Sequence, residues 1–254
     1  MKQAALAVAL SLMVTSAWAQ APAATATPAL DPGAMAALQG MGAYLRTLKV
    51  FQVDVATTDE DVLENGQKDQ YDGMTTILAR MPDALRAEQT SERLQRLYLY
   101  DGKSFTMFAK RSNFYATVPA PATIGKLDEM LDEKYGFNVP LSDLFRWGSP
   151  SWTPEGINVA ADFGPSVVEG TTCQHYGFRQ DDIDWQIWIQ KGDFPLPRKL
   201  VITTKTDEAR PQHTAVYTWN LAPSFNDAAF TFDPPAGAGK VVIAEVNPAA
   251  GAAK

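Results

Sequence analysis

The stretch RLQRLYLYDGKSFTMFAK, from Arg93 to Lys110, contains two apolar runs separated by Asp101-Gly102. An Asp-Gly pair between two such runs is typical of the turn of a β-hairpin. We therefore expect antiparallel strands at 93–100 and 104–110. The chain repeats this pattern on both sides, which predicts a meander of strands that pair with their neighbours in sequence.

Turn residues separate the other predicted strands. Glu64 to Gln67 contains Asn-Gly, and Met81 to Ala84 contains Pro and Asp, which are residues that favour tight turns. These strands are predicted at 50–55, 74–80, 85–90, 114–118, 157–163, 167–178, 182–190, 200–206 and 212–220.

Three segments have helical periodicity instead. Asp31-Pro32 combines an N-cap residue with a proline suited to the first helical turn, and apolar residues follow at steps of three and four as far as Leu48. Further helices are predicted at 124–135 and 141–145. This order predicts an α+β fold with helices on one face of a large, curved antiparallel sheet. We expect one domain over residues 31–246 and no dinucleotide-binding fold, since no parallel β-α-β unit is predicted.

The two ends of the chain differ in composition from this domain. Residues 1–19 combine Lys2, an apolar run and a small-residue site that ends at Ala19, as in a secretory signal peptide cleaved after that residue. Residues 20–30 are rich in Ala, Pro and Thr and predict a disordered linker, and 247–254 predict a flexible tail. We expect an exported chain without a transmembrane segment in its mature form.

The net charge and the reactive residues limit the classes of function that we expect. The net charge of −7, without a compensating basic cluster, argues against a nucleic-acid partner. Cys173 is the single cysteine and cannot form an internal disulfide. Together with His175 it would supply two ligands to a metal, and two ligands do not complete a site. No nucleophile-elbow or zinc-protease motif occurs. We therefore expect no catalytic residues, no metal, no cofactor and no enzymatic activity.

The remaining candidates for a site are apolar. A curved sheet facing helices can enclose either a filled core or a ligand cavity, and periodicity does not separate the two. The candidate cavity residues are Leu97, Leu99, Phe105, Met107, Trp185, Ile187, Ile189 and Tyr217. The helix at 124–135 is a candidate lid, with Leu127, Met130 and Leu131 facing the ligand.

One tryptophan is out of phase. In DWQIWIQ, from Asp184 to Gln190, the apolar residues alternate except at Trp188, which is predicted to face away from Trp185. An open Trp188 with apolar neighbours indicates a docking surface. A Trp188 covered by the N-terminal helix, the linker or a long side chain of a neighbouring strand indicates packing.

Several strings resemble a bacterial family of predicted periplasmic proteins of unknown function, among them LYLYDGKSFTMF, NFYATVPAPATIGKLDEMLDEKYGFNVPLSDLF and FNDAAFTFDPPAGAGKV. More distantly, IWIQKGDFPLPRKL and the ending F-x-F-x-P-P-x-G resemble the LolA and LolB type of periplasmic lipoprotein carrier. That resemblance implies an unclosed β-barrel over helices, with a hydrophobic cavity for acyl chains, and it carries over no catalytic residue. The wider superfamily also includes sensor domains for mislocalised lipoproteins.

These observations predict a non-enzymatic periplasmic binding or carrier protein for a lipid, an acyl chain or another hydrophobic small molecule. The alternative is an envelope-sensing or protein-interaction domain with a filled core, whose partner is an envelope protein.

Overall fold

Twelve strands form one sheet in the part of the chain that the computed structural model describes, residues 30–150, 152–154 and 156–246. Their spatial order is β12-β6-β5-β4-β3-β2-β1-β11-β10-β9-β8-β7. The strands are β1 (Val50–Val62), β2 (Lys68–Arg80), β3 (Ala84–Ser91), β4 (Gln95–Tyr100), β5 (Ser104–Ala109), β6 (Phe114–Pro119), β7 (Val159–Val168), β8 (Thr171–Arg179), β9 (Ile183–Gln190), β10 (Pro197–Thr204), β11 (Gln212–Asn220) and β12 (Gly239–Lys240).

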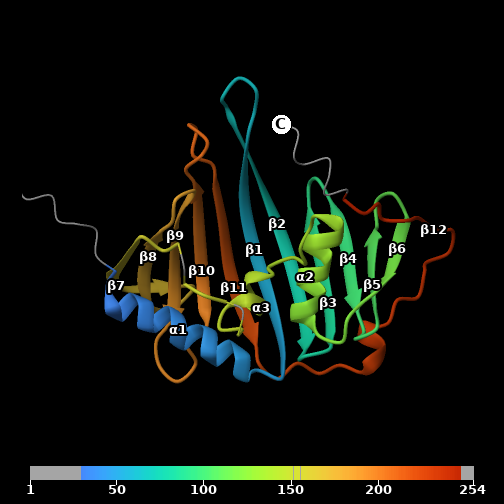
Figure 1. Cartoon of the computed structure of the whole chain (residues 1–254), viewed down its shortest axis with the longest axis horizontal. Coiled ribbons are helices and arrows are strands. Elements are labelled where there is room, and N and C mark those ends of the chain that lie inside the picture. The colour runs from blue at the N-terminus through green and yellow to red at the C-terminus, as the bar shows by residue number, and fades with distance from the viewer. Residues whose placement is uncertain (1–29, 151, 155, 247–254) are drawn as a thin grey trace, which may run out of the picture.

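The sheet confirms the predicted fold class. Strands adjacent in sequence pair antiparallel from β1 to β6 and from β7 to β11, and β1 joins the two series by pairing with β11. The curved sheet is not closed into a barrel, because β7 and β12 lie at its opposite edges (Figure 1). The short strand β12 pairs parallel with β6. The predicted signal peptide, the tail and all of the linker except residue 30 lie outside the described residues.

The α-helices lie on the same face of the sheet (Figure 1). They are α1 (Pro32–Thr47), α2 (Ile124–Tyr135) and α3 (Asp143–Arg146), and a short 3-10 helix, η1 (Asp227–Phe230), follows β11. The predicted start of α1 is confirmed, since the Asp31 carboxylate accepts the N–H of Ala34 at 2.7 Å. Thr123 caps α2 in the same way, and Gly136 ends that helix with a φ of 69°, a conformation that glycine adopts without steric cost.

The alternation of side chains divides the sheet into an inner face, which packs on the helices, and an outer face. On β1 the inner residues Phe51, Val53 and Val55 are buried, whereas outer residues such as Ala56 are exposed. On β9 the predicted inner positions of Trp185, Ile187 and Ile189 are buried too.

The strand β4 departs from this alternation. Leu97, Tyr98, Leu99 and Tyr100 are all buried, because both faces of this strand are covered. The C-terminal strap, which we define as residues 221–246, crosses the outer face and packs Phe232 against Leu97 and Leu99.

The prediction that Leu97 and Leu99 share a face with Phe105 and Met107 is therefore wrong. In the register of the hairpin, Tyr100 lies opposite Phe105 and Tyr98 opposite Met107, while Leu99 lies opposite Thr106 and Leu97 opposite Phe108. Tyr98, Tyr100, Phe105 and Met107 thus form the inner set, and Leu97, Leu99 and Phe108 form the outer set under the strap.

Several strand boundaries also differ from the prediction. β1 continues to Val62 and β2 begins at Lys68, so the first hairpin is longer than predicted. β7 continues to Val168, past a bulge between Asp162 and Gly164, and the turn to β8 lies at Glu169-Gly170. We expected Val167 to begin the next strand. Glu169 and Gly170 both have positive φ, at 46° and 78°, which is the backbone of a two-residue hairpin turn formed here without the usual Asn or Asp.

Candidate functional site

A cleft of about 270 Å³ lies between α3, the loop that follows it and the inner face of β9 and β10. Three indole rings and four aliphatic side chains line it, and Asp143, Arg146 and Gln180 supply polar groups. We call it the tryptophan cleft. Its apolar lining consists of Trp147, Trp152, Trp185, Ile157, Ile183, Leu200, Ile202 and the ring of Pro154.

Close packing of two glycines places the loop that carries Trp147 and Trp152. Gly148 has a φ of 70°, and a Cβ built on it would lie 2.4 Å from the carbonyl carbon of Gly42 on α1. Glycine is thus the residue that permits both the backbone conformation and this approach. Arg46 of α1 adds a clamp, because its Nη1 donates to the carbonyl oxygen of Phe145 at 2.6 Å.

An ion pair between a buried carboxylate and a partly exposed arginine fixes the polar side of the cleft. Nε of Arg146 donates to Oδ2 of Asp128 on α2 at 2.7 Å, and the side chain of Asp128 is only 3% exposed. The other oxygen of Asp128 accepts from Asn138 and from the N–H of Val139, both at 3.3 Å. Burial is therefore compensated by three partners, and α2 is joined to α3 beside the cleft.

The carboxyl group of Asp143, unlike that of Asp128, is in an environment that disfavours its charged form. The side chain of Asp143 is exposed on the wall of the cleft, but the protein packed around its carboxyl group still desolvates that group in part and raises its pKa. Arg146 opposes this shift, and the negative charge of Asp128 adds to it. The wall of the cleft at α3 therefore carries a carboxyl group that protonates more readily than an ordinary aspartate.

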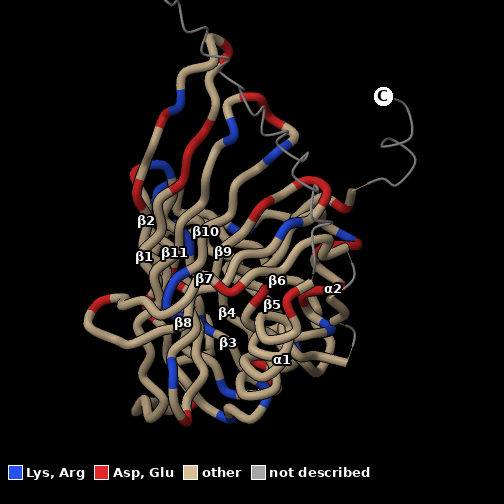
Figure 2. Tube along the Cα trace, turned by 90° about the vertical axis from the view of Figure 1, so that its left-hand side faces the viewer, with Lys and Arg blue, Asp and Glu red and all other residues tan. Residues whose placement is uncertain are grey.

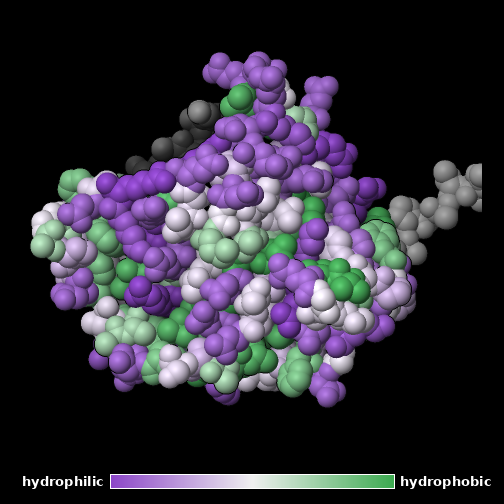
Figure 3. Space-filling view, turned by 180° about the vertical axis from the view of Figure 1, so that it is seen from behind, coloured by the Kyte–Doolittle hydropathy of each residue, from purple (hydrophilic) through white to green (hydrophobic). Residues whose placement is uncertain are grey.

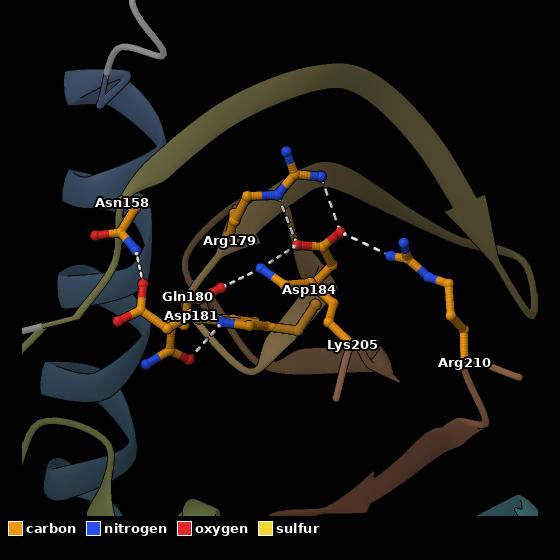
Figure 4. Close-up of polar contacts among 8 residues, drawn as sticks. Asn158, Arg179, Gln180, Asp181, Asp184, Lys205 and Arg210 are labelled. Carbon is orange, nitrogen blue, oxygen red and sulfur yellow. Dashed lines mark hydrogen bonds and ion pairs between the residues drawn. The ribbon is translucent and has the colours of Figure 1, made fainter. Parts of the chain in front are cut away.

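A network around Asp184 positions Gln180, the polar residue on the β9 side (Figure 4). The Asp184 carboxylate accepts two bonds from Arg179, at 2.7 and 2.9 Å, and one from Arg210 at 3.3 Å. Lys205 donates to the backbone oxygen of Gln180, whose side chain in turn accepts from Nε1 of Trp185 at 3.1 Å. The turn between β8 and β9 thus holds the indole of Trp185 in the cleft wall.

A second hollow, of about 440 Å³, continues from the cleft along α2. The two share Arg146, Trp152 and Thr153. We call the second hollow the acidic groove, because Glu129, Asp132 and Glu133 of α2 form one of its walls.

The structure brings one of the predicted cavity residues to the tryptophan cleft, namely Trp185. Ile187, Ile189, Tyr217 and Phe105 are buried in the main core, and Met107 packs against it. In the candidate lid, Leu127 and Leu131 are fully buried and Met130 is partly buried. Leu97 and Leu99 lie on the outer face, away from the helices.

Sequence reasoning missed Trp147, Trp152 and Ile157, which come from the segment WGSPSWTPEGI. Two tryptophans in a stretch rich in Gly, Pro and Ser are a usable signal, because a loop with large apolar side chains must either cover a core or contact a ligand. The periodicity of strands does not detect residues of this kind.

Trp188 faces outward as predicted, and neighbouring strands cover it. Its ring stacks on His175 with centroids 3.9 Å apart, and the ammonium of Lys199 lies 5.0 Å from its centroid. Ser166 accepts its Nε1–H at 3.2 Å. The covering group is thus partly a long side chain of a neighbouring strand. Phe163, which contacts His175 edge-on, is 57% exposed, so an apolar group remains open beside the stack.

Two further findings concern the described ranges alone. Within them, no His, Cys, Asp and Glu side chains gather in a group of three or more that is suited to a metal ion. No helix in the same ranges has the length and apolar character needed to cross a membrane.

Comparison with solved structures gives similarities at low sequence identity. An uncharacterized conserved protein from Thermus thermophilus is 11% identical, with a TM-score of 0.50 over 83% of this chain and 99% of that one. Mycobacterium tuberculosis lipoprotein LppX is 12% identical, with a TM-score of 0.40 over 77% and 100%. The LolA superfamily protein NE2245 from Nitrosomonas europaea is 11% identical, with a TM-score of 0.37 over 78% and 97%.

The Thermus protein therefore shares the fold, and at this identity the likeness extends to the fold alone. No curated protein matches the chain. A family model described as "Predicted periplasmic protein (DUF2092)" matches residues 34–244. Since this match includes most of the chain, the protein belongs to the DUF2092 family of predicted periplasmic proteins.

Proposed function

We propose that this protein is a periplasmic binding or carrier protein that holds a hydrophobic ligand, such as a lipid or an acyl chain, in the tryptophan cleft. The observation that carries the proposal is the lining of that cleft, which combines three indoles with four aliphatic side chains. Binding requires no covalent step, because each methylene moved from water into such a lining contributes about 0.8 kcal/mol.

The size of the cleft sets the mode of binding. Small-molecule sites enclose roughly 300 to 1,000 Å³, and the cleft alone, at about 270 Å³, is just below that range. The acidic groove adds about 440 Å³ on the far side of Arg146 and Trp152. A ligand of lipid size therefore occupies both hollows, with its apolar part under the indoles.

The helix α2 is the lid in this proposal. Leu127 and Leu131 seal the inner face of the sheet in the closed state, and the Asp128 to Arg146 ion pair holds α2 to α3. Lifting α2 exposes these leucines, and a bound acyl chain replaces the contacts that are lost.

Export is part of the same proposal. The family is described as periplasmic, and residues 1–19 have the composition of a signal peptide. We expect the intact mass of protein isolated from a periplasmic fraction to correspond to a chain that begins at Gln20. A mass that includes residues 1–19 contradicts cleavage.

Binding is tested with N-phenyl-1-naphthylamine, a neutral apolar fluorophore, and with mass spectrometry of lipids extracted from natively purified protein. We expect Trp152→Ala to weaken probe binding about tenfold, because loss of a large aromatic contact at a small-molecule site is worth about 1.4 kcal/mol. Trp188→Ala on the outer face of the same sheet is the matched control and leaves binding unchanged. Absence of probe binding and of extractable lipid refutes the proposal.

One observation favours a protein-interaction domain as the second candidate. Phe163 and Val167 of edge strand β7 are 57% and 66% exposed, beside the stack of His175 and Trp188. In the view of the outer face, hydrophobic patches lie between hydrophilic ones (Figure 3). If Phe163→Ser abolishes retention of an envelope protein while Trp152→Ala does not, docking is the function.

A further inference from the structure

The acidic groove sets the charge that surrounds the polar end of a ligand bound in the tryptophan cleft. The groove and the tryptophan cleft share Arg146, Trp152 and Thr153, so an apolar tail under the indoles places its other end beside α2. The site is the cleft, and the residues along the groove act on the end of the ligand that projects from it.

Charge in the groove is unbalanced. Arg146 is the cation that lines it, and its Nε is already bound to the buried carboxylate of Asp128 at 2.7 Å. Glu129, Asp132 and Glu133 are exposed on the same wall, and none of them forms an ion pair within the described residues. Figure 2 shows acidic residues along α2. Three carboxylates therefore remain without a counter-charge where a head group would lie.

We infer that the ligand is an amphiphile whose head group is a cationic amine. This inference rests on the proposed function. The three carboxylates attract an ammonium group and repel a carboxylate or phosphate. The indole of Trp152, at the junction of the two hollows, offers an aromatic face of the kind that recognises alkylammonium groups.

An anionic head is the competing possibility, because Arg146 lies at the same junction. Its guanidinium is oriented by a partner that is almost fully buried, and that partner supplies a negative charge of its own. An anion at this position gains one cation and meets four carboxylates, namely Asp128, Glu129, Asp132 and Glu133. The net charge around the head-group position therefore favours a cationic amine over an anion.

The experiment compares amphiphiles of equal chain length below their micelle concentrations. Dodecyltrimethylammonium, dodecanoate and neutral dodecyl maltoside are titrated into the full mature chain, and binding is followed by tryptophan fluorescence. We expect the ammonium compound to bind about tenfold more tightly than dodecanoate at low salt, with the difference shrinking as salt is added. Tetramethylammonium, which has no tail, does not bind.

The triple variant Glu129→Gln, Asp132→Asn, Glu133→Gln removes the three exposed charges. We expect it to abolish the preference for the ammonium compound over dodecanoate, with dodecyl maltoside titrated beside them as the uncharged reference. It folds, since these side chains are exposed and Glu129 and Glu133 repel each other across one helical turn. The matched control, Glu64→Gln, Glu92→Gln, Glu208→Gln, changes the net charge by the same amount at exposed positions outside the groove and keeps the preference.

The outcomes separate this inference from the function on which it rests. If none of the three amphiphiles binds, the proposed function fails. If all bind but dodecanoate or dodecyl maltoside binds as tightly as the ammonium compound, the function stands and the cationic head group is wrong. If the control triple variant loses the preference equally, the attraction comes from the whole acidic protein, and the groove has no specific role.

Discussion

The two ends of the sheet are built differently. At the end formed by β3 to β6, α2 covers the inner face and the C-terminal strap covers the outer face, so that four consecutive residues of β4 are buried. At the end formed by β7 to β10, the inner face carries the tryptophan cleft. The outer face there is partly open, with Phe163 exposed and Asp184 in a polar network.

This difference assigns separate roles to the two ends. An end that is filled on both faces contributes stability and has little room for a ligand, because its side chains already contact one another. The cleft end contains less tightly filled space between α3, the loop after it and the sheet. Substitutions at the β3 to β6 end should therefore lower stability, and substitutions in the cleft should mainly lower binding.

Phe105→Ala is expected to have the largest effect. The ring is fully buried on the inner face, with its centroid 6.3 Å from those of Tyr98 and Phe137. Removing it leaves a cavity, which lowers the free energy of unfolding by about 4 kcal/mol. The measurement is urea unfolding followed by circular dichroism. Trp152→Ala, at the partly exposed cleft, is the comparison and should cost much less stability. Equal losses would show that the two ends are packed alike.

The same difference explains which parts of the fold the sequence could predict. In DWQIWIQ one face is buried, so alternation alone identified Trp185, Ile187 and Ile189 as inner residues. In QRLYLY both faces are buried, and alternation carries no information about phase. The chain does contain another clue, since the turn over residues 101–104 places Tyr100 opposite Phe105. Without that register, Leu97 and Leu99 were assigned to the wrong face.

Leu99→Ala tests the corrected assignment and is expected to cost about 3 kcal/mol of unfolding free energy. Its partner in the outer set is Phe232 of the strap. The losses caused by Leu99→Ala and Phe232→Ala should therefore be non-additive, with a coupling of at least about 0.5 kcal/mol in a double-mutant cycle. Leu127→Ala on α2 is the control, because it lies across the sheet and should add independently. Coupling of Leu99 to Leu127 instead would place Leu99 on the inner face.

The candidate site could be predicted only in part. The strand residue Trp185 follows from periodicity. Trp147 and Trp152 reach the cleft because Gly42 and Gly148 allow α1 and the loop to approach closely, and that contact joins residues distant in sequence. The cleft and the acidic groove meet at Arg146, and an ion pair joins this residue of α3 to Asp128 of α2. Neither contact is encoded in a local pattern.

The smallest expected loss of stability concerns the outer face of the cleft end. Polar contacts stabilise this face, whereas the apolar strap stabilises the outer face at the other end. Hydrogen bonding from Arg179 is the main cause that lowers the pKa of Asp184, and Lys205 and Arg210 act in the same direction. A carboxyl group whose pKa is lower in the folded state contributes stability above its unfolded pKa and loses it as the pH falls through the folded value. Asp184→Asn should therefore cost at most about 1 kcal/mol at neutral pH, since Arg179 and Arg210 are largely exposed and solvent screens the pair.

The dependence of this cost on pH and salt identifies its cause. The difference between Asp184→Asn and the unmodified protein should disappear in acid and shrink in about 1 M salt, as measured by urea unfolding across pH. Asp181→Asn is the control in the same turn, because Asp181 accepts from the neutral amide of Asn158 at 2.6 Å and its effect should not depend on salt. If the cost of Asp184→Asn persists in acid and in salt, packing rather than charge stabilises this turn. The two outer faces are then more alike than the structure indicates.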